Sequence, residues 1–184
     1  VPALLKRSPF LWCVFVVVHA WLGFIGLTAP TLPWGDVIVV YNTWIQHAFE
    51  GYWVGINGPW VYPILALLPM LAARLFGHDL YGLGWLALTC CANAAVFAFL
   101  LYARSVKRYS SAELRFAAAW WWLAFLLLLG PVALGRIDTF TVAFVIIGLL
   151  LALSRPAIAG IFLAIATWIK VWPITLAVAV IITI

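Results

Sequence analysis

The stretch FLWCVFVVVHAWLGFIGLTAPTLPWGD, residues 10–36, decides the fold of this chain. Its first part, residues 10–28, carries no Lys, Arg, Asp or Glu and is long enough to cross the roughly 30 Å hydrocarbon core of a bilayer as a helix. Pro30 and Pro33 then break the helix, and Asp36 is the first charged residue after it. Residues 10–28 therefore predict a membrane span that ends shortly before an acid.

The composition extends this interpretation to the whole chain. Of 184 residues, 68% are hydrophobic and 8% are charged, whereas a soluble domain carries about 25% charged residues. A water-soluble globule is therefore excluded, and the fold class that we expect is an all-α polytopic membrane protein. Residues 1–184 are expected to form a single transmembrane domain, so any catalytic group must lie in a loop or at the end of a span.

Five more apolar runs predict further spans at about 82–103, 114–130, 139–154, 157–170 and 174–184. The last run has no closing polar flank, so we expect a truncated helix and a chain that is the N-terminal portion of a larger protein. Cys13, Cys90 and Cys91 lie inside apolar runs without the spacing of metal ligands. We interpret these cysteines as small residues that fill space between helices.

Residues 60–76 form an apolar run at the lower length limit for a span, and the charge distribution decides how they lie. Lys and Arg accumulate in cytoplasmic loops. If residues 60–76 cross the membrane, five of the ten Lys and Arg residues are cytoplasmic, but seven are cytoplasmic if these residues lie in the outer interface. The second arrangement is preferred, and it makes residues 29–81 one long external loop. Its cytoplasmic set is Lys6, Arg7, Arg104, Lys107, Arg108, Arg115 and Arg155.

This external loop has the pattern of an interfacial structure. In residues 37–53, apolar side chains recur at helical spacing on one face, and polar side chains that include His47 and Glu50 occupy the other. Such a helix lies on the membrane surface. A Gly-rich turn leads to a second interfacial helix over residues 61–76. For His47 and Glu50, a solvated helix face is the preferred interpretation, and positioning of a sugar or acceptor is the alternative.

Asp36 has two compatible interpretations. An Asp just before a helix is favoured as an N-terminal cap. The same carboxylate lies at the lipid boundary beside Trp34, where partial desolvation would suit a general base.

Three more charged residues gather at the same predicted face of the membrane. Arg136 and Asp138 lie two residues apart in the turn before the span 139–154, which suits either a structural ion pair or a functional site. Lys170 interrupts an apolar region just before Pro173, so it either reaches to the surface or binds an anion. Together with Asp36, these residues describe a site for a lipid-linked anion. His19 and Asn93, in contrast, are interpreted as hydrogen-bonded polar residues of the core.

Two features of the sequence resemble a known group of enzymes. The first span, the Asp soon after it, the loop with two membrane-lying helices and the entry Val61-Tyr62-Pro63 resemble the GT-C superfamily of polytopic glycosyltransferases. Residues 135–173 resemble glycosyltransferase family 87 more narrowly, a family that includes polyprenyl-phosphate-mannose-dependent mannosyltransferases of actinobacterial envelopes. The residues that carry this second likeness are Gly135-Arg136-Ile137-Asp138, Arg155-Pro156, Ala159-Gly160 and Lys170-Val171-Trp172-Pro173.

The resemblance implies an inverting transfer of a sugar from a polyprenyl phosphate to a hydroxyl of a glycolipid or glycan outside the cytoplasmic membrane, and the resemblance to family 87 implies that the sugar is mannose. It implies that Asp36 is the general base, that Arg136 and Lys170 bind the donor phosphate, and that Asp138 positions the sugar or acceptor. The lipid-linked donor would be a substrate, with membrane lipids around it and neither a cofactor nor a metal.

The residues alone leave two other classes of protein open. A transporter or flippase of lipid-linked sugars would carry its charges near the midplane on broken helices and would show inverted repeats. A non-catalytic membrane subunit would use the abundant Trp residues for packing and would tolerate loss of Asp36. The sequence has no nucleotide-binding motif, and Arg104, Lys107 and Arg108 form an ordinary cytoplasmic loop that predicts no nucleic-acid partner.

Overall fold

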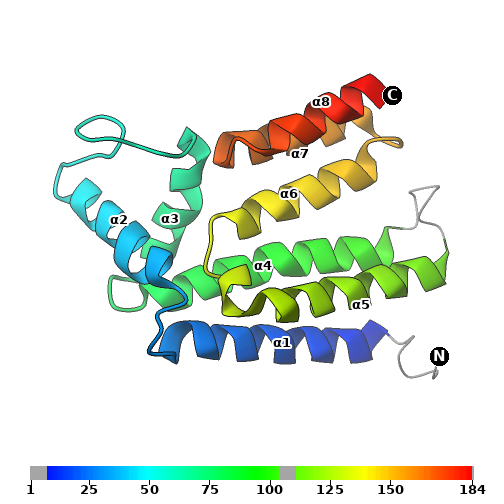
Figure 1. Ribbon diagram of the computed structural model, residues 1–184, viewed down its shortest axis with the longest axis horizontal. Helices are drawn as coiled ribbons and strands as arrows, with labels where there is room; N and C mark the ends of the chain where they lie inside the picture. Colours follow the sequence, from blue (N-terminus) through cyan, green and yellow to red (C-terminus); the bar gives the residue numbers. More distant parts are fainter. Residues whose placement is uncertain (1–7, 104–110, 184) are drawn as a thin grey trace.

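The computed structural model describes residues 8–103 and 111–183, and in these ranges the chain is an all-α polytopic membrane protein (Figure 1). Three segments are long and apolar enough to cross a bilayer: α1 (Ser8–Thr28), α4 (Tyr81–Tyr102), and α5 (Ala112–Leu129) with its 3₁₀ extension η5 (Gly130–Ala133). The other apolar helices are shorter: α6 (Asp138–Leu151), α7 (Pro156–Ile169) and α8 (Pro173–Thr183).

Of these shorter helices, α6 is shorter than predicted, while α7 and α8 are each shifted by one residue. The span expected over residues 139–154 begins one residue earlier and already ends at Leu151, where a turn leads to Arg155. The helices predicted over 157–170 and 174–184 are found as Pro156–Ile169 and Pro173–Thr183, each with Pro at its first position. Proline suits that position because its missing N–H has no partner in the first turn. Helices of 14 residues are about 21 Å long, which is less than the hydrocarbon thickness.

The helices form a bundle in which α4 packs against α1, α3, α5 and α6, while α7 packs between α6 and α8. The segments between α1 and α4, between α5 and α6, and between α7 and α8 all lie at one end of this bundle (Figure 1). We call this the loop end. Arg115 and Arg155, two of the residues predicted to be cytoplasmic, are at the opposite end. The other five, Lys6, Arg7, Arg104, Lys107 and Arg108, lie outside the described residues.

The long loop contains the two short helical regions that the sequence predicts, but with other bounds. The first begins as a π-helical turn, η2 (Asp36–Tyr41), continues as α2 (Asn42–Phe49) and ends before Gly51, whose positive φ of 95° stops it short of residue 53. The second begins only after Pro63, as the 3₁₀ turn η3 (Ile64–Ala66), and continues as α3 (Leu67–Arg74). At eight residues α3 is too short to cross a membrane, so residues 60–76 do not form a span in this structure.

The core between the long helices contains one polar pair. The Asn93 side-chain amide donates to Nε2 of His19 at 3.0 Å, and Nδ1 of the same ring lies 2.9 Å from the carbonyl oxygen of Phe15. Both side chains are buried, so the prediction that they are hydrogen-bonded core residues is confirmed. The three cysteines are free, but Cys13 and Cys91 are exposed and Cys90 is partly buried, so the interpretation as residues that fill space between helices is wrong for Cys13 and Cys91.

Candidate active site

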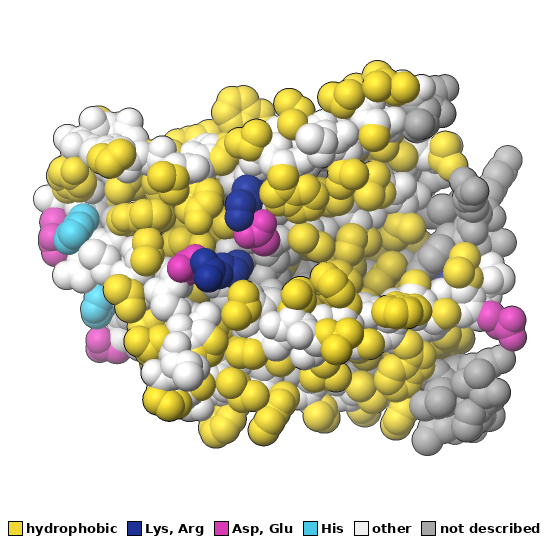
Figure 2. Space-filling view, in the orientation of Figure 1, with side chains coloured by type: hydrophobic (Ala, Val, Ile, Leu, Met, Phe, Trp, Pro, Cys, Tyr) yellow, Lys and Arg dark blue, Asp and Glu magenta, His cyan; other side chains and the backbone are white. Residues whose placement is uncertain are grey.

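The four charged residues that the sequence singled out come together at the loop end of the bundle. Figure 2 shows Lys or Arg side chains and acidic side chains side by side, with mostly hydrophobic side chains around them. They form two ion pairs, Asp36 with Arg136 and Asp138 with Lys170. The side chains are between 28% and 46% exposed, so the cluster is open to a ligand and partly shielded from solvent. Its formal charge is zero.

The first pair joins two loops that are 100 residues apart in the sequence. Nη1 of Arg136 donates to Oδ2 of Asp36. Asp36 is the first residue of the π-helical turn, and the N-cap position is Gly35, so Asp36 is not the cap that the sequence suggested and its carboxylate pairs with Arg136. Arg136 was expected to pair with its close neighbour Asp138 if the charges were structural. The structure pairs it across the site instead.

The second pair lies at the turn between α7 and α8. Nζ of Lys170 lies 2.5 Å from Oδ2 of Asp138, and the indole Nε1 of Trp172 donates to the other carboxylate oxygen at 3.2 Å. Asp138 is the first residue of α6, where the unpaired N–H groups of the helix favour a negative charge. One carboxylate therefore contacts both Lys170 and Trp172 of the Lys-Val-Trp-Pro turn.

Trp34 is the residue that brings the first two loops together, and the sequence analysis noted it only as a neighbour of Asp36. It is fully buried, and its Nε1 donates to the carbonyl oxygen of Pro131 at 2.7 Å. Its ring lies against two glycines: a Cβ atom added at Gly26 or at Gly135 would come within 2.3 Å of it. Trp34 thus anchors the segment before Asp36 to the turn before Arg136. The sequence analysis did not predict this contact, because Gly135 is far from Trp34 along the chain.

An aromatic cluster supports the site on the side of the long loop. Tyr41, Trp44, Trp60 and Tyr62 contact one another with ring centroids 5.3 to 6.4 Å apart. Burial raises the pKa of Tyr41 far above its ordinary value, and the neighbouring Tyr62 adds to the rise. Tyr62 faces the site, with Nζ of Lys170 5.8 Å from its ring centroid.

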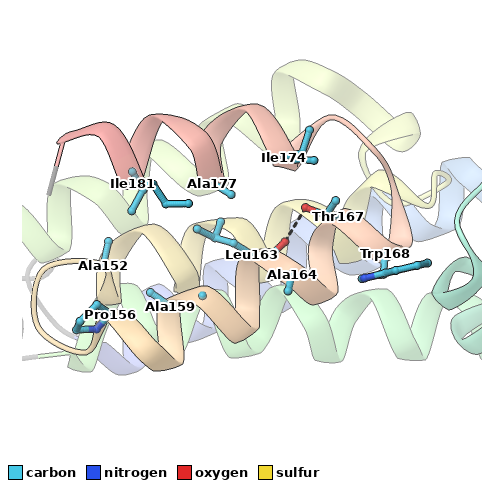
Figure 3. Close-up of a pocket in the computed structure, with 12 residues that line it drawn as sticks. Ala152, Pro156, Ala159, Leu163, Ala164, Thr167, Trp168, Ile174, Ala177 and Ile181 are labelled. Carbon is cyan, nitrogen blue, oxygen red and sulfur yellow. Dashed lines mark hydrogen bonds between the residues drawn. The ribbon is translucent and has the colours of Figure 1, made fainter.

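One cavity reaches the cluster, and a larger groove lies along two other helices. A crevice of about 230 Å³ begins at Arg136 and Asp138 and continues between α5 and α6 along apolar side chains, with Asn93 among its lining residues. We call it the α5–α6 crevice. A second groove, of about 500 Å³, lies between α7 and α8 (Figure 3). It is lined by small and apolar side chains, among them Ala159, Leu163 and Ala177, and contains no charged residue.

His47 and Glu50 do not join the charged cluster. Both are exposed on the last part of α2, where Glu50 accepts a hydrogen bond from Gln46 at 3.2 Å and the His47 ring lies near Tyr52. In Figure 2 the visible histidines lie at the edge of the molecule, apart from the Lys and Arg side chains. Within residues 8–103 and 111–183, no three His, Cys, Asp or Glu side chains come together as possible metal ligands.

Comparison with known proteins gives one match. The family model described as Glycosyltransferase family 87 matches residues 60–183. The matched region contains Tyr62, Arg136, Asp138 and Lys170, and Asp36 precedes it. No curated protein and no solved structure matches the chain.

Proposed function

The chain belongs to glycosyltransferase family 87 and is a membrane-embedded glycosyltransferase, and from this premise we propose that it transfers mannose from a polyprenyl phosphate to a hydroxyl of an envelope glycolipid or glycan. The reaction would take place on the outer face of the cytoplasmic membrane. The observation that carries this proposal is the pair of acid–cation contacts at the loop end, because it combines a candidate base with two phosphate-binding cations.

Asp36 is the general base of the proposed reaction. Its carboxylate takes the proton of the acceptor hydroxyl, and the acceptor oxygen forms a bond to the anomeric carbon while the bond from that carbon to the phosphate oxygen breaks. The electron pair of the broken bond stays on the polyprenyl phosphate. Attack from the side opposite to the phosphate inverts the anomeric configuration. One proton moves to Asp36 and one negative charge moves to the phosphate.

Arg136 and Lys170 are the groups that stabilise this new charge. In the structure each cation is held by an acid, and a donor phosphate between them would compete with Asp36 for Arg136 and with Asp138 for Lys170. Binding of the donor would thereby release the Asp36 carboxylate for the acceptor. Asp138 keeps Trp172 in place and becomes free to hydrogen-bond the sugar. A preorganised hydrogen-bonding group such as Arg136 or Lys170 contributes about 3 kcal/mol to transition-state stabilisation in comparable sites.

The α5–α6 crevice supports a donor that is both anionic and apolar. A cation lies at its mouth and apolar side chains line its interior, as a phosphate followed by a hydrocarbon chain requires. The crevice is much smaller than a polyprenyl chain, so it would accept only the part of the chain nearest to the phosphate. The rest would extend into the bilayer.

The experiment that tests the proposal is transfer of labelled mannose from polyprenyl-phosphate mannose into membrane glycolipids by the wild-type protein and by Asp36→Asn. Asp79→Asn is the matched control, because it makes the same change at an exposed position of the same loop. We expect transfer by the wild type and the control, and loss of transfer by Asp36→Asn with normal insertion. Full activity of Asp36→Asn would show that Asp36 is not the general base. No transfer by any of the three proteins would contradict the proposal that polyprenyl-phosphate mannose is the sugar donor.

A further inference from the structure

We propose that Tyr62 is a positioning residue for the donor, holding the Lys170 ammonium group over its ring so that the group meets the donor phosphate. This inference rests on the proposed function, in which Lys170 binds that phosphate. No family match or sequence motif assigns a role to Tyr62. Its ring would act through Lys170 and would not touch the reacting atoms.

The geometry of Lys170 shows why it needs a second partner. It follows the last residue of α7 in extended conformation, with φ −151° and ψ 144°, so no helix fixes its direction. Its long side chain carries a point charge and loses rotamer freedom when it is held in place. Two contacts limit that freedom here: the Asp138 carboxylate at 2.5 Å and the Tyr62 ring at 5.8 Å. The second distance is within the range of a cation–π interaction.

The two contacts differ in what happens when a phosphate arrives. Asp138 is an anion, so it neutralises Lys170 and competes with the phosphate for the same ammonium group. The Tyr62 ring is neutral, and its negative face attracts the ammonium without removing its charge. The ring can therefore keep Lys170 in position while the phosphate replaces Asp138. This is the property that a positioning group for an anion-binding lysine requires.

Tyr62 is itself held in a fixed place. Its ring contacts Tyr41, Trp44 and Trp60 edge-on, at centroid distances of 6.4, 6.3 and 5.6 Å. The following residue, Pro63, has a restricted backbone and leads into η3. The ring thus connects the aromatic cluster of the long loop to the turn between α7 and α8. Those segments are more than 100 residues apart in the sequence.

The test replaces Tyr62 by Phe and then by phenylalanines with increasing ring fluorination, in the full chain. Fluorine weakens the negative face of the ring and leaves its shape nearly unchanged, so packing is kept while the cation–π attraction decreases. We expect Tyr62→Phe to stay within about twofold of wild type. We expect the KM for polyprenyl-phosphate mannose to rise stepwise with fluorination, by about three- to thirtyfold in total, with the KM for the acceptor unchanged.

Tyr62→Leu gives the same comparison with natural residues, and Tyr52→Leu is its control, since Tyr52 lies in the same loop against His47 and has no contact with Lys170 among the described residues. Tyr62→Leu should raise the donor KM, and Tyr52→Leu should not. An unchanged donor KM across the fluorinated series in an active enzyme would overturn the role of Tyr62 and leave the proposed function intact. Equal loss in Tyr62→Phe and Tyr62→Leu would also overturn it. A wild-type protein without transfer activity would overturn both proposals.

Discussion

Replacement of Trp34 by Phe should destabilise the protein, because this residue joins the two loops that carry Asp36 and Arg136. The change removes the 2.7 Å hydrogen bond from Nε1 of the fully buried Trp34 to the partly buried Pro131 carbonyl. It also removes the part of the indole that lies against Gly26 and Gly135. Phe keeps an aromatic ring at the position, so the backbone geometry of the loop is not changed directly.

The size of the effect follows from these two losses. A buried carbonyl without its partner costs about 1–3 kcal/mol, and the space left by a smaller ring adds about 1 kcal/mol. The free energy of unfolding should therefore fall by about 2–4 kcal/mol. For a chain of this length, 1 kcal/mol corresponds to about 2–4 °C in Tm, so the Tm should fall by about 4–16 °C.

The measurement is thermal unfolding of the purified protein in one detergent, followed by circular dichroism. Trp21→Phe is the matched control, since Trp21 is 56% exposed on α1 and no hydrogen bond of its indole is found among the described residues. The control should change the Tm by less than 2 °C or so. An equal Tm for Trp34→Phe and wild type would refute the anchoring role of Trp34. A loss as large in Trp21→Phe would show that the effect is not specific to this position.

Two further changes test other parts of the structure. Asn93→Leu leaves Nε2 of His19 without its partner in the core, so the free energy of unfolding should fall by about 1–3 kcal/mol. The control Cys91→Leu, at an exposed neighbouring position, should not lower the free energy of unfolding. Equal thermal stability of the two variants would contradict a stabilising role of the buried His19–Asn93 pair. Val142→Phe narrows the α5–α6 crevice and should raise the KM for the lipid-linked donor. Leu149→Phe, farther along α6, should leave this KM unchanged. A rise in the acceptor KM alone would mean that the crevice binds the acceptor.

Much of the fold could be predicted because its signals lie in single segments. A run such as residues 10–28 is apolar over the thickness of a bilayer, whatever its neighbours are. The position of residues 60–76 followed from the distribution of Lys and Arg over all loops, and the structure agrees that no span forms there. The C-terminal end of α6 was predicted at residue 154 and lies at Leu151, since the apolar run continues into the turn at which this helix stops.

The candidate site was predicted in its members and not in its pairings. Counting charges placed Asp36, Arg136, Asp138 and Lys170 at one face, and the structure brings these four together. The pairing of Arg136 with Asp36, and not with its sequence neighbour Asp138, depends on how two loops approach each other. That approach is set by Trp34 and by two glycines far apart in sequence. His47 and Glu50 are both exposed at the C-terminal end of α2, and neither side chain contacts the charged cluster. Their role with a sugar remains a prediction without structural support.

In the proposed reaction the two acids of the site have different tasks. Steady-state kinetics of Asp36→Asn and Asp138→Asn, measured side by side with polyprenyl-phosphate mannose, distinguish these tasks. Asp36→Asn should lower kcat by at least about a hundredfold, because the acceptor hydroxyl loses its base. Asp138→Asn should leave kcat close to wild type and change mainly the donor KM, because Asp138 contacts Lys170 and Trp172 and takes no proton in the proposed reaction. An Asp36→Asn enzyme with normal kcat, or the same kinetic defect in both variants, would contradict this assignment.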